Sequence, residues 1–67
     1  MKRDKFIKTK FNAFMKIMHV QPRSKQETVC MLAAVDFEEE ILILIPLDKE
    51  TFEDITFEAR YENCYIP

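Results

Sequence analysis

Three side chains of this sequence could act as nucleophiles, general bases or soft metal ligands: His19, Cys30 and Cys64. A cysteine nucleophile needs a lowered pKa, and both cysteines lie in apolar segments, where burial raises the pKa of a thiol. A structural zinc site takes about four ligands, usually in close pairs, and three isolated residues do not supply them. The spacing also gives His19 no identifiable catalytic partner. We therefore expect a non-enzymatic protein with no catalytic residue, no metal site and no cofactor.

An acidic turn is the next candidate site, because Asp36, Glu38 and Glu40 place carboxylates at alternate positions. Hard cations such as calcium bind carboxylate oxygens, but the tight loops that hold them commonly contain a glycine. The sequence has no glycine. The same absence excludes the glycine-rich loops that bind nucleotide phosphates. We interpret the acidic turn as a solvated connection, and no small-molecule substrate is indicated.

The charges are divided sharply along the chain. Residues 1–26 carry eight basic side chains and one acidic one, a net charge of +7. Residues 27–67 carry two basic and eleven acidic side chains, a net charge of −9. Lysines interleaved with phenylalanines in the first part can contact phosphates and stack on bases, which makes nucleic-acid binding one hypothesis. The second part would repel a polyanion, and in one fold the two parts can neutralise each other.

The length and composition of the chain limit the fold that can position these residues. With 67 residues, 48% of them hydrophobic, we expect a single small domain over residues 1–67 that buries about 60% of its unfolded surface. No apolar run approaches the roughly 20 residues that span a bilayer, and no apolar signal segment follows the basic N-terminus. The expected setting is the cytoplasm, where Cys30 and Cys64 stay reduced and serve as small buried hydrophobic residues. A disulfide between them would require two strands lying side by side.

Two apolar segments in the middle of the chain predict a hairpin. Residues 28–35 and 41–45 are apolar at nearly every position, which is typical of strands covered on both faces. The acidic turn joins them, and Pro46 ends the second strand because it cannot donate a ladder hydrogen bond. Period-two alternation places Val29, Met31, Ala33 and Val35 on one face, and Cys30, Leu32 and Ala34 on the other.

The C-terminal third predicts a further edge strand. Residues 47–54 form a polar loop with space for one helical turn. Residues 55–61 then alternate apolar and polar side chains, as a half-exposed edge strand does. Residues 64–67 add a short final strand.

Residues 5–20 fit two patterns, and the sequence leaves both open. A helix places Ile7, Phe11, Phe14, Met15 and Met18 on one face, opposite the lysines. A strand alternates Ile7, Thr9, Phe11, Ala13, Met15 and Ile17 with polar residues, interrupted only by Phe14. Periodicity slightly favours the helix, whereas the phenylalanines and β-branched residues have modest helix propensity.

The order and length of these segments resemble a small SH3-like barrel. The segments that carry the resemblance are a strand near residues 7–20, strands at 28–35 and 40–45, an edge strand at 55–61 and a short turn before Cys64. We predict a mostly β fold, a small antiparallel SH3-like barrel or meander of 4–5 strands. The alternative is an α+β fold in which an amphipathic helix at about 5–20 packs on a three-stranded antiparallel sheet. The chain departs from such barrels in having no glycine at strand bends.

Strands that are apolar on both faces need two layers of cover, and a chain this short has little material for the second. We therefore expect a protein-interaction module, which dimerises or binds a protein partner through an apolar sheet face. The alternative is a small nucleic-acid-binding barrel that uses the Lys-rich N-terminal segment. The candidate interaction residues are Lys5, Lys8, Lys10, Phe11, Phe14, Lys16, Phe57 and Tyr61.

Overall fold

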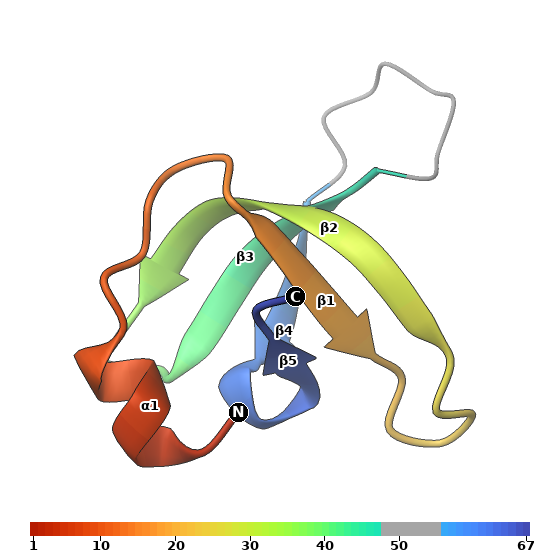
Figure 1. Ribbon diagram of the computed structural model, residues 1–67, viewed down its shortest axis with the longest axis horizontal. Coiled ribbons are helices and arrows are strands. Elements are labelled where there is room, and N and C mark those ends of the chain that lie inside the picture. The colour runs from red at the N-terminus through yellow and green to blue at the C-terminus, as the bar shows by residue number, and fades with distance from the viewer. Residues whose placement is uncertain (48–55) are drawn as a thin grey trace.

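The computed structural model of the chain describes residues 1–47 and 56–67. In chain order its elements are α1 (Arg3–Lys8), β1 (Lys16–Val20), β2 (Glu27–Asp36), β3 (Ile41–Pro46), β4 (Phe57–Arg60), the 3-10 turn η1 (Tyr61–Asn63) and β5 (Cys64–Tyr65). Within these residues all strands pair antiparallel in one 5-stranded sheet of order β4-β3-β2-β1-β5 (Figure 1). The predicted mostly β fold is confirmed. Of the two predicted forms, the structure shows the meander, in an open sheet with β4 and β5 at its edges.

The N-terminal segment is divided between a helix and a strand. α1 has 6 residues, and β1 begins only at Lys16. The alternative of a helix over residues 5–20 is therefore wrong, and the strand predicted near residues 7–20 exists only in its second half. The reason lies at Phe14, which adopts a left-handed φ of 67° while its N–H donates to the Leu32 carbonyl at 2.8 Å. A residue in this conformation interrupts both helix and strand geometry.

β2 and β3 form the predicted hairpin, with a bulge in β2. Leu32 pairs with Leu44, but the next pair in register is Ala34 with Ile43, which leaves Ala33 as the extra residue. A bulge bends its strand and increases the local twist. Figure 1 shows β2 as a long curved strand across the sheet. The chain therefore bends this strand with a bulge, where many barrels use glycine.

The bulge also corrects the predicted alternation along β2. Val29 and Met31 lie on one face and Cys30 and Leu32 on the other, as predicted. Beyond the bulge the faces exchange, so Val35 packs against the core instead of sharing a face with Met31. A single inserted residue has this effect because the side-chain period of a strand is two.

The core lies on one face of the sheet, which we call the inner face. Ile17 of β1, Cys30 and Leu32 of β2, and Leu42 and Leu44 of β3 are between 0% and 2% exposed. They are neighbours across the strands, since Ile17 pairs with Cys30 and Leu32 with Leu44. The inner face is therefore covered almost completely by the chain's own residues.

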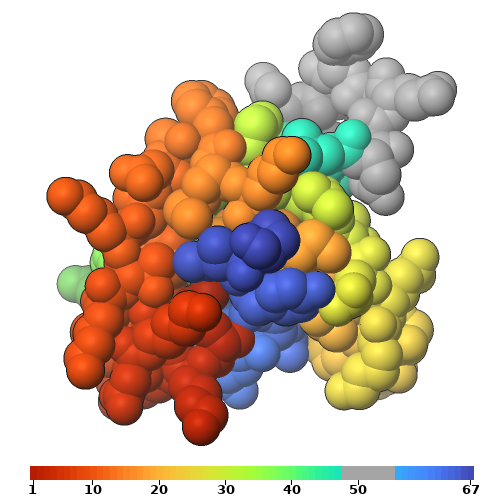
Figure 2. All heavy atoms as spheres, viewed as in Figure 1, coloured from red at the N-terminus to blue at the C-terminus, as the bar shows by residue number. Residues whose placement is uncertain are grey.

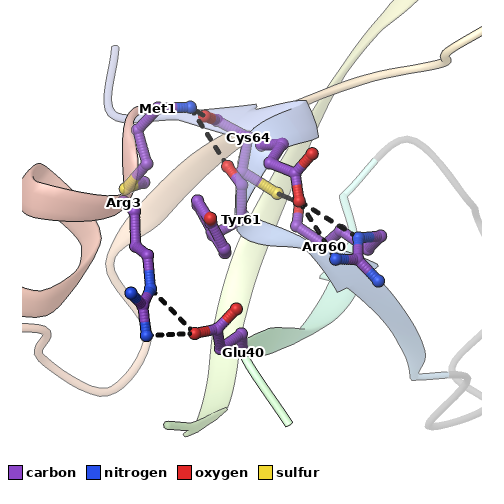
Figure 3. Close-up of polar contacts among 7 residues, drawn as sticks. Met1, Arg3, Glu40, Arg60, Tyr61 and Cys64 are labelled. Atoms are coloured by element: carbon purple, nitrogen blue, oxygen red, sulfur yellow. Dashed lines mark hydrogen bonds and ion pairs between the residues drawn. The ribbon is translucent and has the colours of Figure 1, made fainter.

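Aromatic side chains close one end of this core. The rings of Phe6 in α1 and Tyr61 in η1 stack with centroids 4.8 Å apart. Phe37 and Phe11 flank Phe6 at 5.2 Å and 5.8 Å. The amino group of Met1 donates to the carbonyl oxygens of Tyr61 and Cys64 (Figure 3). The two ends of the chain consequently lie side by side, as Figure 2 shows for the red and blue segments.

The two C-terminal strands are confirmed with shorter bounds, since the edge strand predicted over 55–61 ends at Arg60, Tyr61 belongs to η1, and the final strand ends at Tyr65. β4 is an edge strand in which Ala59 is buried and Glu58 and Arg60 are exposed, and β5 is the short final strand. The polar loop predicted at 47–54 lies, except for Leu47, outside the described residues. In the described part of the chain, no helix is both long enough and apolar enough to cross a bilayer.

Candidate interaction surface

Of the residues with the greatest chemical reactivity, Cys30 and Cys64 are buried and His19 is half-buried. The ring of His19 on β1 meets that of Phe57 edge-on, with centroids 5.1 Å apart, and desolvation by burial lowers the pKa of His19. Cys30 and Cys64 are buried thiols on strands separated by β1, so the side-by-side strands that a disulfide needs are not formed. Burial raises the pKa of Cys64 to about 11. A thiol in that environment is protonated at neutral pH and a weak nucleophile.

The acidic turn is organised by the chain itself. A side-chain oxygen of Asp36 accepts hydrogen bonds from the N–H groups of Glu38 at 3.0 Å and Glu39 at 3.1 Å. Glu40 adopts a left-handed φ of 59° and forms an ion pair with Arg3 at 2.9 Å (Figure 3). Across residues 1–47 and 56–67, no group of three His, Cys, Asp or Glu side chains is placed to hold a metal ion. Asp36 and Glu40 therefore shape the turn and attach α1 to it.

Five of the eight candidate interaction residues are exposed. Lys5 and Lys8 lie on α1, and Lys10 lies on the segment that follows it. Phe14 is 68% exposed, and Lys16 begins β1. These residues are therefore spread over the helix, its connection and the first strand.

The other three candidates are aromatic residues that pack inward. Tyr61 is 8% exposed because its ring stacks on Phe6, so its expected role in binding a partner is not supported. Phe57 is half-buried against His19, and Phe11 packs on the core beside Phe6. The sequence indicated that these side chains are apolar, but it could not show that α1 would cover Tyr61 and that His19 of β1 would pack against Phe57.

The basic and acidic parts of the chain meet at α1. Arg3 pairs with Glu40, and the Phe37 ring in the acidic turn contacts Phe6 in the helix. This contact brings the turn that carries Glu38 and Glu39 against the helix that carries the lysines. The two charged parts therefore lie together, which reduces the positive potential that a polyanion would meet at α1.

The outer face of the sheet carries a second apolar surface. Strand alternation places Met31, Ile43 and Ile45 opposite the buried leucines of β2 and β3, and Met31 and Ile45 are paired neighbours. Met18 of β1 pairs with Val29 of β2, which is 39% exposed. All five side chains keep part of their surface exposed. We call these five residues, Met18, Val29, Met31, Ile43 and Ile45, the outer patch.

The outer patch continues at one end of the sheet. Tyr65 of β5 pairs with Met18 and is 37% exposed, while Leu47 is 44% exposed and donates its N–H to the Val29 carbonyl at 3.2 Å. The Tyr65 hydroxyl donates to the carboxylate of Glu27 at 2.7 Å, and this bond raises the pKa of Tyr65. The hydrogen bond fixes the phenol on the surface, beside the apolar residues.

Opposite charges flank the outer patch on its two sides. Lys16 on β1 pairs with Met31, and Glu58 on β4 pairs with Ile43. Both side chains are exposed, and each is one strand outside the central pair β2 and β3. The apolar strip therefore has Lys16 on its β1 side and Glu58 on its β4 side. Arg60 shares the outer face of β4 with Glu58, and its charge is already paired with Glu62 at 3.1 Å.

Sequence reasoning found the cause of this surface but named few of its residues. The double-sided apolar pattern of residues 28–35 and 41–45 required a second layer of cover, and alternation already placed Val29 and Met31 together. Of the eight candidates, Lys16 borders the outer patch through its pairing with Met31. The other residues of the outer patch could have been identified only from the pairing of the strands, which the sequence pattern does not reveal.

Comparisons of the chain with protein-family models, with curated proteins and with solved structures found no match. The interpretation of function consequently depends on the geometry of the chain itself.

Proposed function

We propose that this chain is a non-enzymatic protein-interaction module that binds its partner through the outer patch. The observation that carries the proposal is that β2 and β3 are apolar on both faces while the described residues bury only the inner one. Leu42 and Leu44 are fully buried at 0% exposure, whereas the alternating Ile43 and Ile45 are only partly buried and keep some of their surface in water. Contiguous exposed apolar surface with a polar rim is characteristic of protein interfaces.

The composition of the outer patch supports binding to a protein. Removing apolar surface from water contributes roughly 25 cal/mol per Å². Met18 and Met31 add flexible thioether side chains, which adapt to irregular surfaces, and Tyr65 adds an aromatic side chain with a polar end. Because the patch lies on paired strands, binding would require little ordering of its backbone.

The Lys-rich segment is a weaker basis for function. The lysines on α1 lie beside the acidic turn, and Phe11 is packed against the core. Of the phenylalanines offered as stacking platforms, Phe14 is the one with most of its surface exposed, at 68%. Nucleic-acid binding therefore remains the alternative hypothesis, and the structure adds no observation in its favour.

Site-specific photo-cross-linking tests the proposal. A photoreactive phenylalanine analogue is placed at position 31 or 43 in the outer patch, or at position 7 as the control. Ile7 lies on α1 and is 55% exposed, so random collisions should label it at least as often. We expect a discrete adduct from positions 31 and 43 in the source cell, identified by mass spectrometry, and none from position 7.

Binding of the identified protein is then measured with purified components. We expect Ile43→Glu to weaken this binding at least tenfold and Ile7→Glu to leave it unchanged. Equal labelling from all three positions, or no adduct from a folded chain, would contradict the proposed function.

A further inference from the structure

We infer that the partner of the outer patch is a second copy of this chain, packed face to face about a two-fold axis that runs along the strands between β2 and β3. This inference rests on the proposed function and identifies its partner. A two-fold interface brings the same surface of both copies together, so that surface must be complementary to itself. The outer patch meets this requirement in both charge and apolar content.

The charges are placed symmetrically about the proposed axis. In the order β4-β3-β2-β1, Glu58 lies one strand beyond β3, and Lys16 lies one strand beyond β2. Within the part of the chain that the structure describes, neither side chain forms an ion pair. Both charges are therefore available to a group that approaches the outer face.

A rotation about an axis parallel to the strands exchanges the two sides of the sheet. It brings Lys16 of one copy over Glu58 of the second copy, and the same contact forms again by symmetry. Across the sheet, Lys16 is level with Met31 and Ile45, whereas Glu58 is level with Ile43. The two charged residues are therefore offset by two residues along the strand direction. That offset is roughly 7 Å along the strand, which the extended lysine and glutamate side chains span together.

The other face-to-face arrangement is disfavoured by the same charges. An axis in the plane of the sheet but perpendicular to the strands places each outer strand over its own copy. Lys16 would then approach Lys16, and Glu58 would approach Glu58. Like charges opposed across an interface cost binding energy and disfavour that arrangement. A shifted axis would bring Glu58 over Arg60 of the second copy, but Arg60 is already paired with Glu62 within its own chain. The charge pattern therefore favours the axis along the strands.

The apolar residues match in the selected arrangement. A rotation about the strand direction preserves position along the strands, so Met31 of one copy lies over Ile45 of the second copy. These residues are in one row, since they pair within the chain. Two sheets packed in this way are about 10 Å apart, a separation that side chains of this size fill. The centre is apolar and the two ion pairs form its rim, as in typical protein interfaces.

Exchange of the two charges tests the inference in the intact chain. Sedimentation equilibrium measures the dimerisation constant of the wild type, of Lys16→Glu, of Glu58→Lys and of the double variant. Each single variant opposes like charges at both contacts, and we expect it to weaken dimerisation by about tenfold. The double variant restores both pairs with their signs exchanged, and its constant should return to within about threefold of the wild type.

Mixing the two single variants is the sharpest part of the test. The mixed dimer has an attractive pair at both contacts, although each variant alone has none. We expect the mixture to form heterodimers in preference to either homodimer, and high salt to reduce this preference. Lys5→Glu, on exposed helix α1, is the control with the same charge change and should dimerise like the wild type. Circular dichroism confirms that each variant is folded.

Two results would overturn the inference. The first is a wild type that stays monomeric at every concentration tested. The second is a dimer whose constant changes neither in the single charge variants nor in Ile43→Glu. If photo-cross-links at positions 31 and 43 then identify a different protein, the proposed function stands and this inference alone fails. If those positions label nothing, both fail.

Discussion

The two faces of the β2–β3 hairpin contain similar amino acids but have different surroundings. On the inner face, Leu32, Leu42 and Leu44 are at most 2% exposed. On the outer face, Met31 and Ile43 alternate with them and are only partly buried. Hydrophobicity alone therefore does not decide which face becomes the core.

The difference comes from where the rest of the chain can reach. The inner face is covered by α1 and η1, whose Phe6 and Tyr61 rings stack over the end of the core. The Met1 amino group and the Arg3–Glu40 ion pair attach the helix to that side. The same short segments cannot also cover the outer face, which explains why apolar side chains there stay partly exposed.

The largest effect is expected where the helix covers the inner face. Phe6 is 1% exposed, whereas its neighbour Ile7 is 55% exposed. Phe6→Ala should lower the free energy of unfolding by about 3–5 kcal/mol, because it removes a buried ring and leaves a cavity. Ile7→Ala should lower it by less than about 1 kcal/mol. Urea denaturation measures both, and similar losses would mean that α1 does not cover the core.

A second pair of variants compares the two faces on one strand. Leu44→Ala should cost about 2–5 kcal/mol because Leu44 is fully buried at 0% exposure. The neighbouring Ile45→Ala should cost about half as much in the monomer, since Ile45 keeps part of its surface in water. Urea denaturation at a protein concentration low enough to keep the chain monomeric measures the difference in unfolding free energy. A cost for Ile45→Ala that equals that of Leu44→Ala would show that the outer face is covered within the monomer.

A third change concerns the exposed, strained residue before β1. Phe14 has a φ of 67° and is 68% exposed, so its ring contributes little to the core while its backbone is strained. Asparagine tolerates this conformation, and Phe14→Asn should raise the stability by up to about 1 kcal/mol. The thermal midpoint measures it. A clear loss of stability would show that the Phe14 ring makes contacts that its exposure does not indicate.

The smallest effect concerns pH. Desolvation lowers the pKa of His19 in the folded chain below its ordinary value of 6.5, so the unfolded chain binds a proton first as the pH falls. Stability should therefore be constant above this value and decline as the pH falls from 6.5 towards the folded pKa. His19→Gln should remove this decline, while the titration of other groups cancels in the difference between the two curves. A difference of the opposite sign would contradict the packing of His19 against Phe57.

Much of the fold was predictable from local pattern. The hairpin, the edge strand and the final strand follow from alternation and from Pro46, and the structure confirms them. The division of residues 5–20 was not predictable, because it depends on Phe6 and Phe11 packing into the core while Phe14 turns outward. Such packing is decided by tertiary contacts, which local propensity does not include.

The candidate surface was predictable in kind but not in detail. The excess of apolar residues in β2 and β3 required a second cover, and the charge division indicated contacts between the two parts of the chain. Two features escaped the sequence pattern. The bulge at Ala33 moved Val35 to the core, and the pairing of β1 and β4 with the central strands brought Lys16 and Glu58 beside the outer patch.

The most direct test of the central claim is the solvent accessibility of methyl groups on the two faces as a function of protein concentration. A soluble gadolinium chelate broadens the NMR signals of exposed methyl groups. In dilute protein we predict broadening for Met31, Ile43 and Ile45 and none for Ile17, which is 0% exposed. In concentrated protein the three outer signals should become protected while that of Ile17 is unchanged. Outer methyl groups that are equally accessible at every concentration, or protected already in the dilute monomer, would contradict the account.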